Sequence, residues 1–140
     1  MIPIYSIDTP HRMTDTPNPI INVIHKYAVS TPNNIAFRYG SDSIYSDITY
    51  CELYNIICLC ESYYSLQCNN KQYQSKKKIY RRYIGIYAQS NVQYNITILT
   101  LMKLKFIPIC ISTRNSVRAV QHLMVGDDTV QLMYISSTLT

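Results

Sequence analysis

The sequence has little glycine and no tryptophan. Its 140 residues include only three glycines, Gly40, Gly85 and Gly126. A loop that holds phosphate groups through backbone amides needs several glycines close together, because a residue without Cβ lets the backbone approach the ligand. Three scattered glycines therefore exclude a phosphate-binding loop of the Walker type or of the dinucleotide type in this chain.

A long apolar run is also missing. The nearest candidate, residues 94–112, contains Asn95, Lys103 and Lys105, whereas a membrane-spanning helix needs about 20 predominantly apolar residues. The N-terminal residues MIPIYSIDTPHR do not show the charged-then-apolar pattern of a secretory signal peptide. We therefore expect a cytoplasmic protein with no membrane partner.

The cysteines do not form a recognisable disulfide or metal pattern. Their number is odd, with cysteine at positions 51, 58, 60, 68 and 110, which suits a reducing compartment better than a disulfide framework. Cys58 and Cys60 form a C-x-C pair without the second pair or the histidines that zinc sites use. We expect buried free thiols and assign no metal ligand.

Positive charge is concentrated in one short segment. The chain has 13 Lys and Arg against 8 Asp and Glu, a net charge of +5, and five of the cations lie within seven residues: Lys76, Lys77, Lys78, Arg81 and Arg82. Basic residues interleaved with tyrosines, as in residues 76–83, can bind nucleic acid or another polyanion by charge and base stacking. A solvated loop explains the same composition, so we do not expect nucleic acid as a partner.

The first half of the chain predicts helices around a small hairpin. Residues 1–18 are rich in proline and polar side chains and predict a loose leader. A helix is expected from Pro19 to the Thr31-Pro32 break, because apolar residues recur there at helical spacing. Two β-prone runs, residues 35–39 and 43–48, flank the turn-forming Gly40-Ser41-Asp42 and predict a hairpin.

A capping box marks the next helix. Thr49 and Glu52 have the T-x-x-E spacing in which each side chain bonds a backbone amide of the other residue. Apolar residues then follow helical spacing to about Leu66. Residues 68–78 are polar and basic, and they predict an exposed loop.

The second half alternates β-prone and helical segments. Residues 79–88 and 106–111 are β-prone and are separated by an apolar helix over residues 92–104. Unbroken apolar runs joined in this way predict buried parallel strands with a right-handed crossover. A further helix, capped by Asn115 or Ser116 and ended by Gly126, precedes a β run over residues 129–135. The fold class is therefore α/β, a mostly parallel sheet with flanking helices and a small N-terminal β-hairpin.

The order of these motifs resembles the start of an adenylate-forming (AMP-binding) domain, the family of acyl-CoA synthetases and of nonribosomal peptide synthetase (NRPS) adenylation domains. Three segments carry the resemblance: INVIHKYAVSTPNNIAF, ITYCELYNIICL and the stretch from Ile84 to Met124. The turn Ser112-Thr113-Arg114-Asn115-Ser116 is most similar to the fungal-type NRPS-like branch. Lys103-Leu104-Lys105 departs from the family, which usually has glycine after this helix.

The resemblance implies that residues 19–140 are the N-terminal fragment of such a domain. The intact enzyme would activate a carboxylic or amino acid with ATP and Mg²⁺ and pass it to a phosphopantetheine carrier. The family's lysine-containing phosphate loop, adenine-binding segment, ribose-binding aspartate and late lysine have no counterpart here. We therefore expect this chain to be inactive alone, and we assign no catalytic, cofactor-binding or metal residue.

Several single residues have side chains that could act in a site, but their sequence context does not support such a role. His11, His25 and His122 have no nucleophile at an interpretable spacing, and Ser136 to Thr140 offers hydroxyls without glycine or lysine. Arg114 could meet a phosphate, but a structural role in its turn is the simpler hypothesis. Two interpretations of the chain stay open: a piece of a working enzyme, or a remnant without activity of its own.

Overall fold

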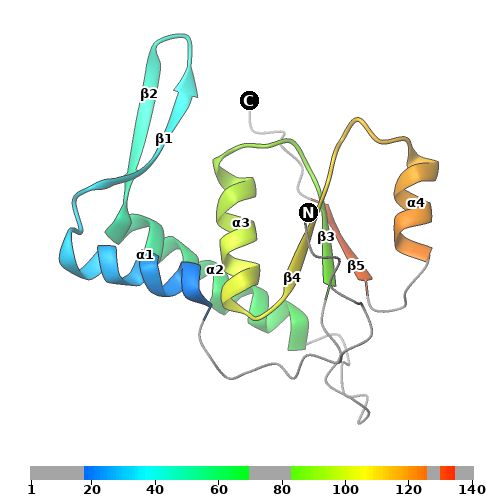
Figure 1. The fold of residues 1–140 in the computed structure, drawn as a ribbon, viewed down its shortest axis with the longest axis horizontal. Helices are drawn as coiled ribbons and strands as arrows, with labels where there is room; N and C mark the ends of the chain where they lie inside the picture. Colours follow the sequence, from blue (N-terminus) through cyan, green and yellow to red (C-terminus); the bar gives the residue numbers. More distant parts are fainter. Residues whose placement is uncertain (1–17, 70–82, 126–129, 135–140) are drawn as a thin grey trace, which may run out of the picture.

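The computed structural model describes residues 18–69, 83–125 and 130–134. Figure 1 shows their elements in chain order, which are α1 (Pro19–Ser30), β1 (Ile35–Ser41), β2 (Ile44–Thr49), α2 (Tyr50–Asn69), β3 (Tyr83–Tyr87), α3 (Val92–Lys103), β4 (Ile107–Ile111), α4 (Val117–Val125) and β5 (Val130–Tyr134). The predicted leader lies outside the described residues except Asn18, as does the predicted basic loop beyond residue 69. Both stay predictions.

Helix α1 begins with a side-chain cap and ends with a backbone hydrogen bond. The Asn18 side-chain oxygen accepts a hydrogen bond from the Ile20 amide at 3.0 Å, and Pro19 occupies the first turn, where a missing N–H costs nothing. At the other end the Thr31 amide donates to the Tyr27 carbonyl at 2.9 Å. Ile21 and Ile24 are buried, whereas Ile20, Val23 and Tyr27, which belong to the same apolar spacing, are exposed.

The hairpin pairs β1 and β2 antiparallel. Its turn does not lie at Gly40-Ser41-Asp42, where the sequence predicted it. Ser41 faces Ile44, so the turn consists of Asp42 and Ser43, whose φ angles are 53° and 69°. Two consecutive positive φ angles are what a type I′ turn requires. Gly40 lies within β1 at φ 146°, where a Cβ would collide with the Ile44 carbonyl oxygen. Glycine is therefore needed for the close approach of the strands, and the turn does not include it.

Helix α2 begins at the predicted capping box. The Glu52 amide donates to Thr49 Oγ1 at 3.3 Å, and the Thr49 amide donates to Glu52 Oε2 at 2.8 Å, so two amides that a helix start leaves unpaired are satisfied. The helix continues to Asn69, beyond the predicted end at Leu66. Residues 68 and 69, expected in the loop, are therefore helical.

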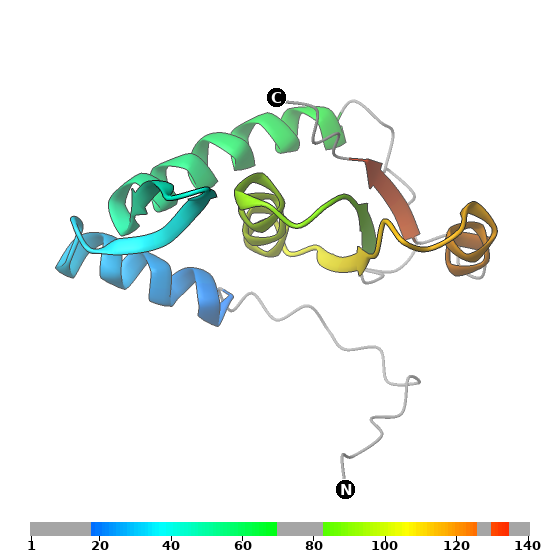
Figure 2. The same cartoon turned by 90° about the horizontal axis from the view of Figure 1, so that it is seen from above.

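Three parallel strands form the main sheet. Strand β3 pairs in parallel with both β4 and β5, giving the order β4-β3-β5. The predicted β-α-β-α-β succession is confirmed. Figure 2 shows α3 and α4 on opposite sides of this sheet. Strands β3 and β4 are adjacent. After β3 the chain continues on one face of the sheet, and after β4 it continues on the opposite face.

Helix α3 joins two apolar clusters. Its residue Ile96 packs with α1, α2 and β2 in the first cluster, which includes Leu53 and Ile57. Its residue Leu101 packs with Ile84 and Ile86 of β3 in the second. A helix apolar on several sides is expected at the centre of a fold. Over the described part of the chain, no helix is both long and apolar enough to cross a membrane.

Candidate functional site: a cleft at the carboxyl edge of the sheet

A cleft of about 550 Å³ opens where β3 and β4 end. Its walls come from the segment after β3 and from the end of β4 with the turn that follows, and the lining residues are Ala88, Gln89, Ser90, Tyr94, Cys110, Ile111, Ser112, Thr113 and Arg114. In open α/β sheets, ligands bind beyond the carboxyl ends of adjacent strands whose connections go to opposite faces. The junction of β3 and β4 has this topology, so we name the feature the switch-point cleft.

The start of α3 forms one wall. Asn91 caps the helix, and its Oδ1 accepts a hydrogen bond from the Tyr94 amide at 2.8 Å. This cap places Tyr94 in the first turn, where it lines the cleft and its hydroxyl forms a hydrogen bond with Cys110. A half-buried aromatic ring thereby faces a strand end that carries a thiol.

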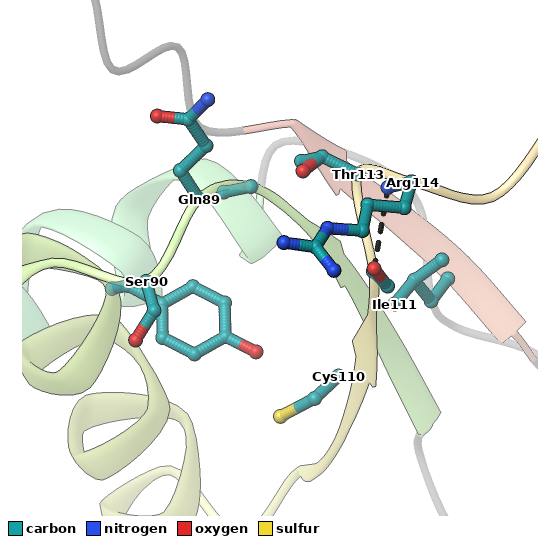
Figure 3. A pocket seen from close by; sticks show the side chains of 9 residues that line it. Gln89, Ser90, Cys110, Ile111, Thr113 and Arg114 are labelled. Atoms are coloured by element: carbon teal, nitrogen blue, oxygen red, sulfur yellow. Dashed lines mark hydrogen bonds between the residues drawn. The ribbon is translucent and has the colours of Figure 1, made fainter.

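The turn after β4 forms the opposite wall. The Arg114 amide donates to Ser112 Oγ at 3.2 Å, and the Asn115 amide donates to the Ser112 carbonyl at 3.1 Å. The Tyr87 hydroxyl, at the end of β3, donates to the Thr113 carbonyl at 3.2 Å. The Tyr87 bond ties the turn to the neighbouring strand β3. Figure 3 shows the Arg114 guanidinium extending over the cleft.

Among the described residues that line the cleft, none has an acidic side chain. The two ion pairs among the described residues lie elsewhere, between Arg38 and Asp47 and between Lys103 and Glu61. Burial of the phenol, and then its hydrogen bond with Cys110, raises the pKa of Tyr94 to about 12. Tyr94 is therefore a neutral donor or acceptor near pH 7, and Arg114 provides the positive charge.

The structure brings only one of the sequence candidates into this cleft. Arg114 lines it, whereas His122 is exposed on α4 and His25 is exposed on α1, with its ring centre 4.7 Å from that of Tyr54. The described residues contain no group of three or more His, Cys, Asp or Glu side chains that could hold a metal ion. His11 and the segments 76–82 and 136–140 lie outside the described residues.

Sequence reasoning missed the other cleft residues. Gln89, Ser90, Tyr94 and Cys110 were not predicted as site residues, and the two halves of the site are about 20 positions apart. The available signal was topological, because the segments after two parallel strands of one β-α-β unit meet at the same edge of a sheet.

Comparisons with known proteins identify the fold. No protein-family model and no curated protein match the sequence, but solved structures do. The N-terminal subdomain of Klebsiella oxytoca NpsA matches with a TM-score of 0.64 and 16% identity over 86% of this chain. The fatty acid AMP ligase from Legionella pneumophila matches with a TM-score of 0.61 and 15% identity over 84% of this chain.

The fold is that of the N-terminal part of an adenylate-forming enzyme. A structure of Klebsiella oxytoca NpsA in complex with 3-hydroxyanthranilyl-AMSN matches as well, with a TM-score of 0.62 and 13% identity over 82% of this chain. The chain spans 28% of the length of the NpsA subdomain structure and 19% of the fatty acid AMP ligase. At these identities the likeness establishes the adenylate-forming fold alone.

Proposed function

We propose that this chain is the N-terminal part of an enzyme that activates a carboxylic or amino acid with ATP. The observation that carries the proposal is the match of 86% of the chain to an N-terminal subdomain of the adenylate-forming fold. The sequence motifs support it independently, because ITYCEL and the segment from Ile84 to Met124 follow the family's order.

In this proposal the chain supplies framework and the rest of the enzyme supplies the chemistry. Attack of a carboxylate on the α-phosphate of ATP requires three phosphates, Mg²⁺ and the acid to be held in line. No glycine-rich loop ending in lysine is present here. ATP, Mg²⁺, the acid substrate and a phosphopantetheine carrier therefore belong to the intact enzyme, which we place in the cytoplasm and in the NRPS-like, fungal-type branch.

The coding sequence that follows codon 140 tests this proposal directly. We expect it to encode a loop rich in Ser, Thr and Gly that contains a lysine, followed by the later adenylation motifs. A stop codon, or a frame without these motifs, would contradict the proposal of a working enzyme and favour an inactive remnant.

The isolated chain offers a second test. Calorimetric titration with ATP·Mg²⁺ is expected to show no micromolar binding, and no pyrophosphate should form when an organic acid is added. Micromolar binding that depends on Mg²⁺ would overturn the assignment of the chemistry to the rest of the enzyme. The alternative function, polyanion binding through residues 76–83, gains no support from the comparisons.

A further inference from the structure

We propose that the switch-point cleft binds a small organic phosphate, with the Arg114 guanidinium as the anchor for the phosphate group. The organic part would lie against the ring of Tyr94 on the opposite wall. This site is separate from the acid activation proposed above, since it uses only residues of this chain and neither ATP nor Mg²⁺.

The charge of the cleft selects an anion. Arg114 points over the cleft, and no described acidic side chain bonds its guanidinium. The surrounding sequence adds no compensating negative charge, because no Asp or Glu occurs between Glu61 and Asp127. An unpaired guanidinium presents a planar fork of N–H donors, which matches phosphate and carboxylate oxygens in a bidentate geometry.

The polar groups favour phosphate over a single carboxylate. Ser112 and Thr113 line the cleft next to Arg114 and carry hydroxyls, and a phosphate has enough terminal oxygens to accept from several donors at once. The amino-terminal ends of α3 and α4 also point toward this edge of the sheet, so both helix dipoles add positive potential there.

Two amides in the first turns of these helices are already occupied. Asn91 Oδ1 already accepts from the Tyr94 amide, and Ser116 Oγ accepts from the Ala119 amide at 3.2 Å. We therefore assign the main contact with the phosphate to the Arg114 side chain, which carries the positive charge of the cleft. Loss of Arg114 should consequently remove most of the binding.

The volume of the cleft indicates an organic ligand. Small-molecule sites typically measure about 300–1,000 Å³, and the observed 550 Å³ falls within this range. A bare phosphate ion would leave most of this space to water. Tyr94, Ile111 and Ala88 supply apolar surface beside the polar groups, as a ligand with an aromatic or aliphatic part requires.

Phenyl phosphate is a suitable probe, because it combines a phosphate with a ring. We would titrate it into the full 140-residue chain at low ionic strength, in a buffer free of phosphate and sulfate, and follow amide chemical shifts. Saturable shifts are expected at residues 88–90, 94 and 110–114. Phenol should bind at least about tenfold more weakly, because it lacks the charge-assisted hydrogen bonds.

Two matched variants separate local anchoring from general charge. Arg114→Gln should weaken phenyl phosphate binding about tenfold or more, whereas Arg118→Gln removes the same charge from the first turn of α4, outside the cleft lining, and should change it less than about twofold. Arg114→Lys keeps the charge but loses the fork and should be intermediate. Circular dichroism would verify that each variant is folded.

Several results would overturn the site. One is the absence of saturable binding at millimolar phenyl phosphate, and another is an equal loss of affinity in Arg114→Gln and Arg118→Gln. Binding of phenol as tight as that of phenyl phosphate would also overturn it, as would amide chemical-shift changes confined to residues 76–82. None of these results bears on the proposed adenylation function, because that proposal is tested by the coding sequence after codon 140.

Discussion

At the scale of single residues, burial and local partners decide how a side chain behaves. Tyr94 shows this clearly, because its amide holds the helix cap while its phenol lies half-buried against Cys110. Asn91 stands directly before an apolar helical segment, a position at which asparagine commonly caps a helix. Sequence reasoning could not find the Tyr94–Cys110 contact, since the two residues meet only when β4 pairs with β3.

The free energy of unfolding should fall in alkaline solution, partly because the Tyr94 phenol ionises more easily in the unfolded state. Its pKa is raised from 10.0 to about 12, so the folded state keeps the proton that the unfolded state loses. This contribution is fully present below pH 10 and is lost as the pH rises toward 12. We expect the urea midpoint of the wild-type protein to fall more steeply between pH 10 and 12 than that of Tyr94→Phe.

Tyr45→Phe is the matched control for this experiment. It removes the same hydroxyl from a side chain that is 63% exposed on the hairpin, and it should follow the wild-type curve. If Tyr94→Phe and Tyr45→Phe show the same pH dependence as the wild type, burial of Tyr94 does not contribute to the alkaline transition.

At the scale of elements, the ends of the helices are formed by short-range bonds. Helix α3 ends in a Schellman motif, in which the Phe106 amide donates to the Leu101 carbonyl at 2.9 Å and the Lys105 amide donates to the Met102 carbonyl at 3.1 Å. Lys105 has a φ of 64°. A lysine therefore occupies the left-handed position at which the family resemblance led us to expect glycine.

Lys105→Gly should stabilise the protein. Glycine adopts a positive φ without the Cβ clash that costs other residues roughly 1 kcal/mol, so we expect a gain of about 0.5–1 kcal/mol in the free energy of unfolding. Urea denaturation at pH 7 would measure it. Gln93→Gly, in the exposed first turn of the same helix, is expected to lose stability, and a gain in both variants would argue against the φ-based explanation.

At the scale of the whole molecule, α3 connects the helical and hairpin part to the parallel sheet. Ile96 belongs to the first cluster and Leu101 to the second, and the Lys103–Glu61 ion pair ties α3 to α2. Because one rigid helix carries contacts of both clusters, we expect the two clusters to unfold together in one cooperative transition.

Leu101→Ala tests this cooperativity. Leu101 is fully buried, so its truncation should cost about 2–5 kcal/mol. Hydrogen exchange should then become faster in α1 and α2 as well as in β3. Leu59→Ala, at a side chain that is 72% exposed, should change stability by less than about 0.5 kcal/mol. Faster exchange in β3 with unchanged protection in α1 would mean that the clusters unfold separately.

The sequence by itself determined the features that depend on neighbours along the chain. The Thr49–Glu52 capping box, the helical faces and the alternation of strands and helices follow from hydrogen bonds and periodicities spanning a few residues. Tertiary structure decided the order β4-β3-β5, the turn at Asp42-Ser43 and the meeting of Tyr94, Cys110 and Arg114. These depend on pairing between strands distant in the chain, and local propensity does not encode which strand edges come together.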